Sequence, residues 1–342
     1  MKEKISFVAI GQAGGNIGKL LEEKGYSVLY INTSKEDLQT LTGVKYTYHI
    51  PQGEGCNKDR LKAKQLVIDD FDNIAKEIDL KLKTKVIYLL FASGGGTGSG
   101  AGPMLMDLLL DEKKTVGAVT ILPSIKESIK SQINCYECFS ELAAIEASSG
   151  IFVLDNDKGE RLSINSQFVD LLDEFIQIPE KHKSVSGNID KAELEESMKA
   201  RGMSLLAKSK DAGTADILKA LSSSVFAPME ADQVLKYITI SIHGSLDMPE
   251  IEKAVGVPLD TFQTYNDSNT LCMLSGLSYP KTRLDAVYQR IAENRETVLR
   301  NMQSAAETKL NEDVNFLSGI TKPQKEEKPK SKRDIMNKYF KG

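Results

Sequence analysis

The chain has 342 residues, of which 41% are hydrophobic and 27% are charged, and its net charge is −4. A chain of this length can bury one large hydrophobic core or two ordinary ones without disulfide or metal crosslinks. No segment reaches the roughly 18 uncharged apolar residues that a membrane-spanning helix needs. The composition therefore predicts a globular chain without a membrane span.

The cysteines and histidines exclude several other classes of protein. The apolar run after the N-terminus breaks at glycines and lacks a small-residue cleavage site, so no signal peptide is predicted. Cysteines in a chain without an export signal predict free thiols in a reducing cytoplasm. The Cys135–Cys138 pair has no second pair or nearby histidine, and three scattered histidines leave little material for a zinc site or a Ser-His-Asp triad. The residues concerned are Cys56, Cys135, Cys138, Cys272, His49, His182 and His243.

The first half of the chain alternates apolar, partly β-branched runs with helical patterns. This alternation is typical of a doubly wound, mainly parallel α/β sheet with helices on both faces. Such sheets bind ligands beyond the carboxyl ends of their strands, so the loops there are candidate sites. Strands are predicted at 4–10, 27–31, 85–91, 115–122 and 150–155, and helices at 14–24, 57–77, 98–112 and 128–147.

The second half predicts a smaller mixed α+β region. A helix at 162–180, ended or kinked by Pro179, links the two halves. Residues 282–310 predict a long helix with one apolar stripe, which packs along its own domain or against a neighbouring subunit. Further helices are predicted at 191–208, at 212–223 and after Met248, and strands at 236–243, 259–265 and 270–276.

Glycines crowd the loop after the first predicted strand, GQAGGNIG at 11–18. They let backbone amides approach a phosphate at a helix N-terminus. A dinucleotide-binding loop looks similar, but a dehydrogenase has an acidic residue at the end of its second strand to hold the ribose. Asn32 follows that strand here, so a nicotinamide dehydrogenase is disfavoured.

A second glycine-rich loop, ASGGGTGSGAG at 92–102, follows the strand at 85–91. Its backbone N–H groups can surround a diphosphate or triphosphate, and the hydroxyls of Thr97 and Ser99 add donors. It is not a Walker A loop, because the required lysine is absent. This loop predicts a nucleotide site.

The GGGTGSG run at 94–100 resembles the phosphate loop of the tubulin/FtsZ superfamily. The resemblance implies GTP and GDP as ligands, Mg²⁺ as a cofactor, and head-to-tail protofilaments of identical subunits. It covers about residues 4–276 and extends to GQAGGNIG at 11–18, INTSKEDL at 31–38, QGEGCN at 52–57, LDNDK at 154–158 and ITISIHGSLDMPEIEKA at 238–254.

The same resemblance implies a domain organisation for the chain. It comprises a GTP-binding domain at 1–161, a core helix with the catalytic loop at 162–190, a second domain at 191–280, a C-terminal helix at 281–320 and a disordered basic tail at 321–342.

The resemblance also implies the nucleotide-binding residues. Asn16 would lie near the guanine edge, and either Asn165 or Gln167 of the core helix would add a polar contact. Glu127 resembles a ribose contact, although Ser131 replaces the basic residue often found four positions later. No residue is singled out as a metal ligand. The implied set is Gly11, Gln12, Ala13, Gly14, Gly15, Asn16, Asn32, Gly55, Asn57, Gly94, Gly95, Gly96, Thr97, Gly98, Glu127, Asn156, Asn165 and Gln167.

The segment GNIDKAE at 187–193 has two interpretations. Read alone, it starts a helix whose dipole Asp190 and Glu193 stabilise. Its N-x-D-x-x-E spacing also resembles the loop that each superfamily subunit inserts into the nucleotide pocket of the next. That resemblance implies that Asp190 and Glu193 orient the water that attacks the γ-phosphate, so that hydrolysis requires assembly.

The C-terminal tail is basic while the rest of the chain is acidic. Residues 322–342 contain eight basic and three acidic residues, a net of +5, so residues 1–321 carry −9. A long helix followed by a basic tail resembles the plasmid- and phage-partition branch of the superfamily. This implies a bacterial cytoplasmic filament whose tail binds a centromere-binding adaptor protein on DNA. The tail residues implied are Lys330, Lys332, Arg333, Lys338 and Lys341.

Other interpretations of the tail and of the filament stay open. The tail could contact DNA phosphates directly without sequence specificity, bind an anionic lipid surface, or remain a solvated arm. The chain could also be an FtsZ-like or structural filament gated by nucleotide, with slow hydrolysis and no DNA cargo.

Overall fold

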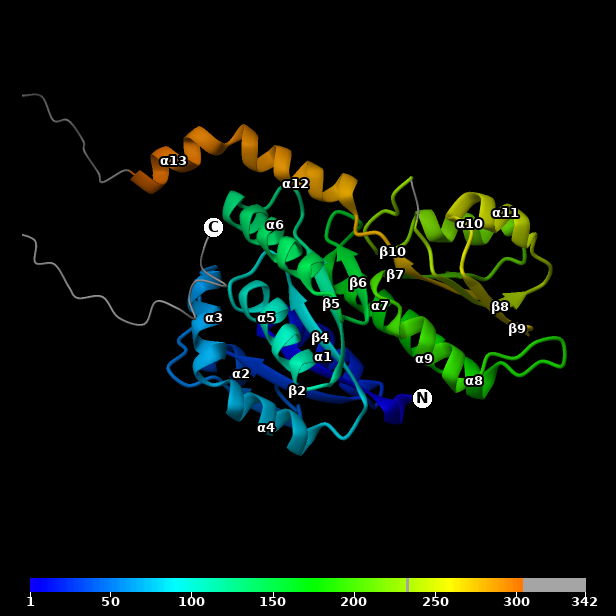
Figure 1. The fold of residues 1–342 in the computed structure, drawn as a ribbon, viewed down its shortest axis with the longest axis horizontal. Coiled ribbons are helices and arrows are strands. Elements are labelled where there is room, and N and C mark those ends of the chain that lie inside the picture. Colours follow the sequence, from blue (N-terminus) through cyan, green and yellow to red (C-terminus); the bar gives the residue numbers. More distant parts are fainter. Residues whose placement is uncertain (232–233, 304–342) are drawn as a thin grey trace, which may run out of the picture. The chain divides into compact units, whose positions relative to one another are not determined.

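Ten strands of the described residues pair into one sheet (Figure 1). The structure is a computed structural model that describes residues 1–231 and 234–303. The strands are β1 (Ile5–Ile10), β2 (Ser27–Asn32), β3 (Tyr46–His49), β4 (Val86–Ala92), β5 (Thr115–Leu122), β6 (Gly150–Asp155), β7 (Gly202–Ser209), β8 (Tyr237–His243), β9 (Asp260–Asn266) and β10 (Thr270–Leu277). Their order across the sheet is β3-β2-β1-β4-β5-β6-β7-β10-β8-β9.

Helices connect these strands and cover the sheet. Every residue of β1 and β6 is buried, which requires packed layers on both faces of the sheet. The helices are η1 (Lys2–Lys4, a 3₁₀ turn), α1 (Gly11–Glu23), α2 (Lys35–Thr40), α3 (Arg60–Asp69), α4 (Phe71–Lys81), α5 (Thr97–Asp111), α6 (Ile129–Ala144), α7 (Arg161–Ile176), α8 (Ile178–Lys181), α9 (Lys191–Lys199), α10 (Thr214–Ser222), α11 (Met248–Val255), α12 (Lys281–Glu293) and α13 (Arg295–Gln303). None of these described helices is long and apolar enough to cross a membrane.

The topology confirms the predicted α/β class. All neighbouring pairs from β3 to β7 are parallel, whereas β10 runs antiparallel to both β7 and β8. From β1 the chain moves outward to β2 and β3, and β4 then starts on the other side of β1. Parallel α/β sheets bind ligands where the strand order reverses in this way. The fold therefore directs attention to the carboxyl ends of β1 and β4.

Helix α7 runs across the sheet from the carboxyl ends of the parallel strands to their amino ends. It begins at Arg161, shortly after the carboxyl end of β6, and packs against α1, β7 and β10. Pro179 lies in the first turn of α8, which follows the end of α7 at Ile176. There Glu180 Oε1 accepts a hydrogen bond of 2.8 Å from the amino group of Met1, which precedes β1. Because α7 has 16 residues, it spans about 24 Å from one end of the sheet to the other.

The prediction of a helix over 191–208 is wrong in its second half. Helix α9 ends at Lys199, and β7 occupies 202–209 between β6 and β10. Gly202 makes the change of direction possible, because its φ of +116° is strained for other residues and a Cβ there would lie 2.4 Å from the carbonyl oxygen of Leu277. Burial in the sheet decided the conformation of an apolar run that suits either structure.

Two other predicted helices are interrupted in the structure. The helix predicted at 57–77 is two helices, α3 and α4, separated at Asp70, whose carboxylate accepts hydrogen bonds from Tyr48 and Asn73. The helix predicted at 282–310 breaks at Asn294, which has non-helical dihedral angles, and residues 304–310 lie outside the described residues. The short strand β3 is an additional element that the sequence patterns did not reveal.

Candidate functional site

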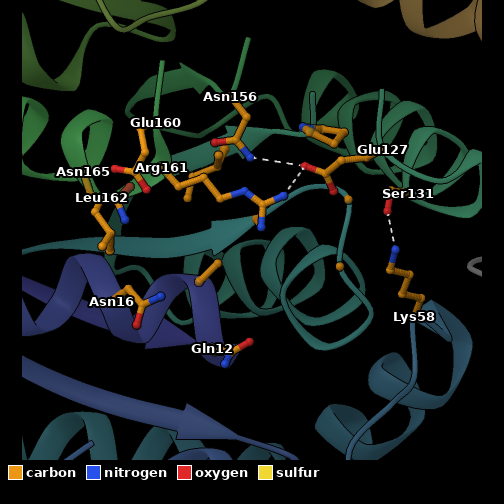
Figure 2. Close-up of a pocket in the computed structure, with 16 residues that line it drawn as sticks. Gln12, Asn16, Lys58, Glu127, Ser131, Asn156, Glu160, Arg161, Leu162 and Asn165 are labelled. Carbon is orange, nitrogen blue, oxygen red and sulfur yellow. Dashed lines mark hydrogen bonds and ion pairs between the residues drawn. The ribbon is translucent and has the colours of Figure 1, made fainter. Parts of the chain in front are cut away.

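Two adjoining cavities open at the carboxyl ends of β1, β4 and β5. The larger has a volume of about 420 Å³ and the smaller about 310 Å³. Figure 2 shows side chains from several elements pointing into the larger one. Volumes of about 300–1,000 Å³ are usual for small-molecule sites. The two cavities share the residues Gln12, Ala13, Ala92 and Gly95.

The N-termini of two helices lie at the smaller cavity. Helix α1 begins at Gly11 and α5 at Thr97, and neither helix has a side-chain cap. The free N–H groups of such helix ends and the positive end of the helix dipole favour a bound anion. The arrangement suits the phosphates of a nucleotide.

Glycine is required at two close backbone contacts around this cavity. A Cβ on Gly96 would lie 2.7 Å from the backbone nitrogen of Lys58, and one on Gly14 would lie 2.1 Å from the carbonyl oxygen of Leu90. A side chain at Gly96 would push the two loops apart, and one at Gly14 would push α1 away from β4. The close approach of backbone to backbone explains why these two positions hold glycine.

The larger cavity presents polar side chains suited to a base and a sugar. Asn16 and the buried Asn165 line it from α1 and α7. Glu127 Oε1 accepts hydrogen bonds from Arg161, at 2.8 Å, and from Asn156, at 3.4 Å (Figure 2). Amide groups can offer both a donor and an acceptor to a purine edge, while a carboxylate can accept from ribose hydroxyls.

A buried arginine ties helix α12 to the wall of this cavity. Arg283 donates to Asp155 Oδ2 at 2.9 Å and to Asp157 Oδ2 at 2.8 Å. Asp157 also accepts from the hydroxyl of Ser124, at 2.6 Å, and so fixes the turn that carries Glu127. The carboxylates raise the pKa of the Arg283 guanidinium against the opposing effect of burial. The wall of the cavity thus depends on an ion pair from a distant part of the sequence.

Most of the nucleotide-binding residues expected from the sequence lie together at these cavities. Asn165 lines the larger cavity, whereas Gln167 is exposed, donates to Ser163 Oγ and faces a separate hollow. Those that line one or both cavities are Gly11, Gln12, Ala13, Asn16, Gly55, Asn57, Gly94, Gly95, Gly96, Thr97, Gly98, Glu127, Asn156 and Asn165.

Three of the expected residues support the loops without lining either cavity. Gly14 and Gly15 are packed within α1. Asn32 is buried, where its Nδ2 donates to Asp37 and its Oδ1 accepts from the backbone of Ser34. These residues lie beneath the residues that line the cavities and pack against them.

Four charged side chains that sequence reasoning missed also line the cavities. Lys58, Glu160 and Arg161 line the larger cavity and Asp37 the smaller one. Asp37 lies inside the INTSKEDL segment and Lys58 directly follows QGEGCN, so proximity to a recognised loop was the available signal.

The described residues hold no cluster of three or more His, Cys, Asp or Glu side chains that could bind a metal by itself. Asp37, Ser34 and Thr97 nevertheless supply oxygen atoms beside the smaller cavity. This set fits Mg²⁺, which takes one or two carboxylates together with phosphate oxygens.

Cys135 is buried on α6, where burial raises the pKa of its thiol to about 12, so it is neither a ready ligand nor a nucleophile.

Asp190 and Glu193 lie far from both cavities. They form a capping box at the start of α9: Asp190 Oδ1 accepts from the backbone of Glu193 at 2.9 Å, and Glu193 Oε2 accepts from the backbone of Asp190 at 2.9 Å. Next to them, Lys191 contacts Glu180 at 3.2 Å, beyond the far end of α7. The two acids and the cavities therefore lie at opposite ends of α7, because Arg161 at its start lines the larger cavity while Lys191 contacts Glu180 beyond its end.

Each acid keeps one carboxylate oxygen free within the described residues. The hydrogen bonds of the capping box use Oδ1 of Asp190 and Oε2 of Glu193. Asp190 is exposed and Glu193 is half-buried. The preceding loop is held by Thr264 Oγ1, which donates to the carbonyl oxygens of His182 and Gly187 at 3.0 Å each. The two acids are thus presented at the surface on a fixed loop.

Comparison with known proteins agrees with this geometry. The model of the Tubulin/FtsZ family GTPase domain matches residues 4–163. The tubulin-like protein TubZ of a Clostridium botulinum C phage is 31% identical over 99% of this chain and 100% of its own length.

Solved structures show the same fold. The crystal structure of Clostridium botulinum phage c-st TubZ has a TM-score of 0.78 at 28% identity and covers 87% of this chain and 100% of that one. A GTPγS-form protofilament of Bacillus thuringiensis serovar israelensis TubZ has a TM-score of 0.75 at 16% identity, covering 88% and 94%, and supports the fold alone. This chain belongs to the tubulin/FtsZ family, with TubZ among its relatives, and residues 4–163 are its GTPase domain.

Proposed function

We propose that this GTPase assembles head to tail into filaments and that each subunit completes the active site of its neighbour. The domain boundaries expected from the sequence, with the GTP-binding domain at 1–161 and the second domain at 191–280, are part of this proposal. The finding that carries it is the position of the two acids. Helix α7, about 24 Å long, separates Asp190 and Glu193 from the cavities of their own subunit.

A head-to-tail stack would bring the two acids of one subunit close to the cavities of the next subunit. When one end of a subunit meets the opposite end of the next, the contact repeats along an open filament. In such a stack the exposed capping loop of one copy would meet the cavities of another. Hydrolysis would then depend on assembly.

The residues of the composite site would have separate roles. The uncapped N-termini of α1 and α5 would hold the phosphates, and Asn16 and Asn165 would contact the base. Phosphoryl transfer needs a positioned water and charge stabilisation more than covalent chemistry. The free carboxylate oxygens of Asp190 and Glu193 would orient that water.

Magnesium would complete the smaller cavity. Asp37 supplies a carboxylate there, and Ser34 and Thr97 supply hydroxyls. When bound, Mg²⁺ would neutralise part of the charge on the phosphates.

The first experiment measures phosphate release from GTP with Mg²⁺ over a series of protein concentrations, with light scattering recorded in parallel. We expect the specific activity to be near zero at low concentration and to rise together with scattering above a threshold. A specific activity that is independent of concentration would show that each subunit hydrolyses GTP alone and would refute the shared site.

We further propose that the filaments segregate plasmid or phage DNA in the bacterial cytoplasm through a centromere-binding adaptor. The support is the similarity to a phage TubZ over nearly the whole chain and the basic composition of residues 322–342, which lie outside the described residues. Deleting residues 322–342 should leave GTP turnover and scattering intact but increase loss of the replicon that encodes the chain. Unchanged inheritance of the replicon would contradict this assignment.

A filament gated by nucleotide, with slow hydrolysis and no DNA cargo, is the second candidate. The complete capping box favours it, because Asp190 and Glu193 already have a structural role inside one subunit. Substitutions that keep the cap and remove the charge distinguish the two candidates, as described in the Discussion.

A further inference from the structure

Lys58 is a cationic side chain that the proposed roles leave unexplained. It lies in the turn before α3, is half-buried and lines the larger cavity opposite Arg161 (Figure 2). Asn57 and Lys58 both have positive φ, 42° and 59°. Non-glycine residues rarely adopt this conformation, and it often marks functional sites.

Among the described residues, the ammonium group of Lys58 contacts hydroxyl groups only. Its Nζ donates to Ser128 Oγ at 2.8 Å and to Ser131 Oγ at 2.6 Å, and within the described residues it pairs with no carboxylate. The other cation of this cavity, Arg161, is paired with Glu127 at 2.8 Å. Lys58 therefore brings an uncompensated positive charge to the cavity.

The position of this charge is unfavourable without an anion. Ser128 is the N-cap of α6, a helix of 16 residues. The N-terminus of a helix carries a partial positive charge, which repels a cation. A bound anion would offset this repulsion and would supply the counter-ion that Lys58 lacks.

The turn that carries Lys58 is fixed against the phosphate loop. Asn134 Nδ2 donates both to the carbonyl oxygen of Lys58, at 3.1 Å, and to that of Gly95, at 2.7 Å. The close approach of Gly96 to the backbone of Lys58 joins the same two loops. The backbone of Lys58 is thus held at a defined place beside the glycine loop.

We propose that the ammonium group of Lys58 binds the phosphates nearest the sugar of the bound nucleotide. The inference rests on the nucleotide site of the proposed function. Lys58 lines the cavity that contains Glu127 and Gly94, whereas Gly98 and Thr97 line the other one. The contact therefore belongs to a phosphate that GDP and GTP share.

The test compares K58Q with K126Q by calorimetric titration with GDP, GTP and guanosine. Glutamine keeps a long polar side chain and the same backbone strain but removes the charge. Lys126 is exposed and precedes Glu127, so K126Q controls for the loss of one surface charge. Circular dichroism and thermal unfolding without nucleotide check that both variants fold.

We expect K58Q to lose about 10- to 100-fold in affinity for GDP and for GTP alike, the usual size of a charge-assisted hydrogen bond. Its affinity for guanosine should match that of the wild type. Equal GDP affinity in K58Q and K126Q, a loss confined to GTP, or an equal loss for guanosine would each overturn the assignment. GDP binding is measured without assembly, so a flat activity profile for the wild type would refute the shared active site and leave the test of Lys58 intact.

Discussion

The two ends of helix α7 differ in how their polar groups are satisfied. At the Arg161 end, helices α1 and α5 start without side-chain caps, and Lys58 lacks a counter-ion within the described residues. At the far end, Asp190 and Glu193 have reciprocal partners inside their own subunit. The first region is incomplete without a ligand, while the second is complete as a helix cap.

This difference indicates which functional residues can be recognised from the structure of a single subunit. Unmet hydrogen-bonding capacity and unpaired charge identify a binding site directly, because buried polar groups need partners. A residue with a sufficient structural role gives no such signal, even where it has a second role in an assembly. The predictions below test whether the far end of α7 is a cap only.

The largest expected effect comes from D190N. Asparagine caps helices as well as aspartate, so the fold should be retained while the carboxylate is lost. Above the assembly threshold, GTP turnover should fall about 100- to 10,000-fold with scattering unchanged, the range for loss of a group that acts on the attacking water. Phosphate release from preformed filaments measures it.

E193Q is the matched variant at the other position of the box. Glutamine at the third helical position can still accept from the N-cap backbone. We expect a loss of turnover with filaments retained. Wild-type turnover in both D190N and E193Q would mean that this end of α7 is only a cap, and the slowly hydrolysing filament would then be the better assignment.

The next effect tests how firmly the cavity end is held together. R283M removes a buried cation and leaves Asp155 unpaired in the interior. Loss of one partner of a buried ion pair costs about 3–5 kcal/mol. Urea unfolding should show a decrease of this size, against at most about 0.5 kcal/mol for K281M, an exposed lysine of the same helix. A decrease for R283M as small as that for K281M would show that the ion pair does not stabilise the cavity wall.

G96A sharpens the comparison within the cavity. The added Cβ would lie 2.7 Å from the backbone nitrogen of Lys58, so the two loops must separate. Overpacking of this kind costs about 1–3 kcal/mol, so we expect GDP to bind roughly 5- to 150-fold more weakly. The control is G159A, whose Cβ would meet only Ile164 at 3.8 Å. Equal GDP affinity in the two variants would contradict a close-fitting phosphate loop.

The fold was predictable where one periodicity dominated. The alternation of β-branched runs and helical patterns identified β1, β2, β4, β5 and β6 and hence the parallel sheet. It failed at 200–208, where an apolar run fits a helix or a strand equally well. Only the pairing of β7 between β6 and β10, made possible at Gly202, decides that conformation.

The site was predictable where glycine was required and unpredictable where tertiary packing chose the residue. The glycines at 11–18 and 94–100 predicted that these two loops meet at a site, and the structure places both loops at the smaller cavity. Asn165 and Gln167 are two positions apart and face different directions on α7. Burial of Ile164 and Phe168 fixes the rotation that brings Asn165 into the cavity. Lys58 was missed because it reaches the cavity from an irregular turn that shows no periodic pattern.

The smallest expected effect concerns the loop that presents Asp190. His182 starts this loop, and its Nδ1 lies 2.8 Å from Ser241 Oγ. Burial lowers the pKa of this imidazole below 6.5, while Glu174 opposes the shift and Lys181 adds to it. The unfolded chain therefore binds more protons than the folded one between pH 6.5 and the lowered pKa, and stability should fall as the pH drops through that window.

H182Q should remove this part of the pH dependence. Thermal unfolding at pH 7.5 and at pH 5.5 measures it in the wild type and the variant. We expect the fall in Tm between the two pH values to be smaller in H182Q, by an amount limited by the partial exposure of the imidazole. An equal fall in both proteins would show that His182 does not couple the loop to pH. A second measurement locates the pH sensitivity when the fall in Tm is smaller in H182Q. If GTP turnover by wild-type filaments decreases below pH 6.5 while their GDP affinity stays constant, the pH sensitivity belongs to the Asp190 end of α7 and not to the cavity.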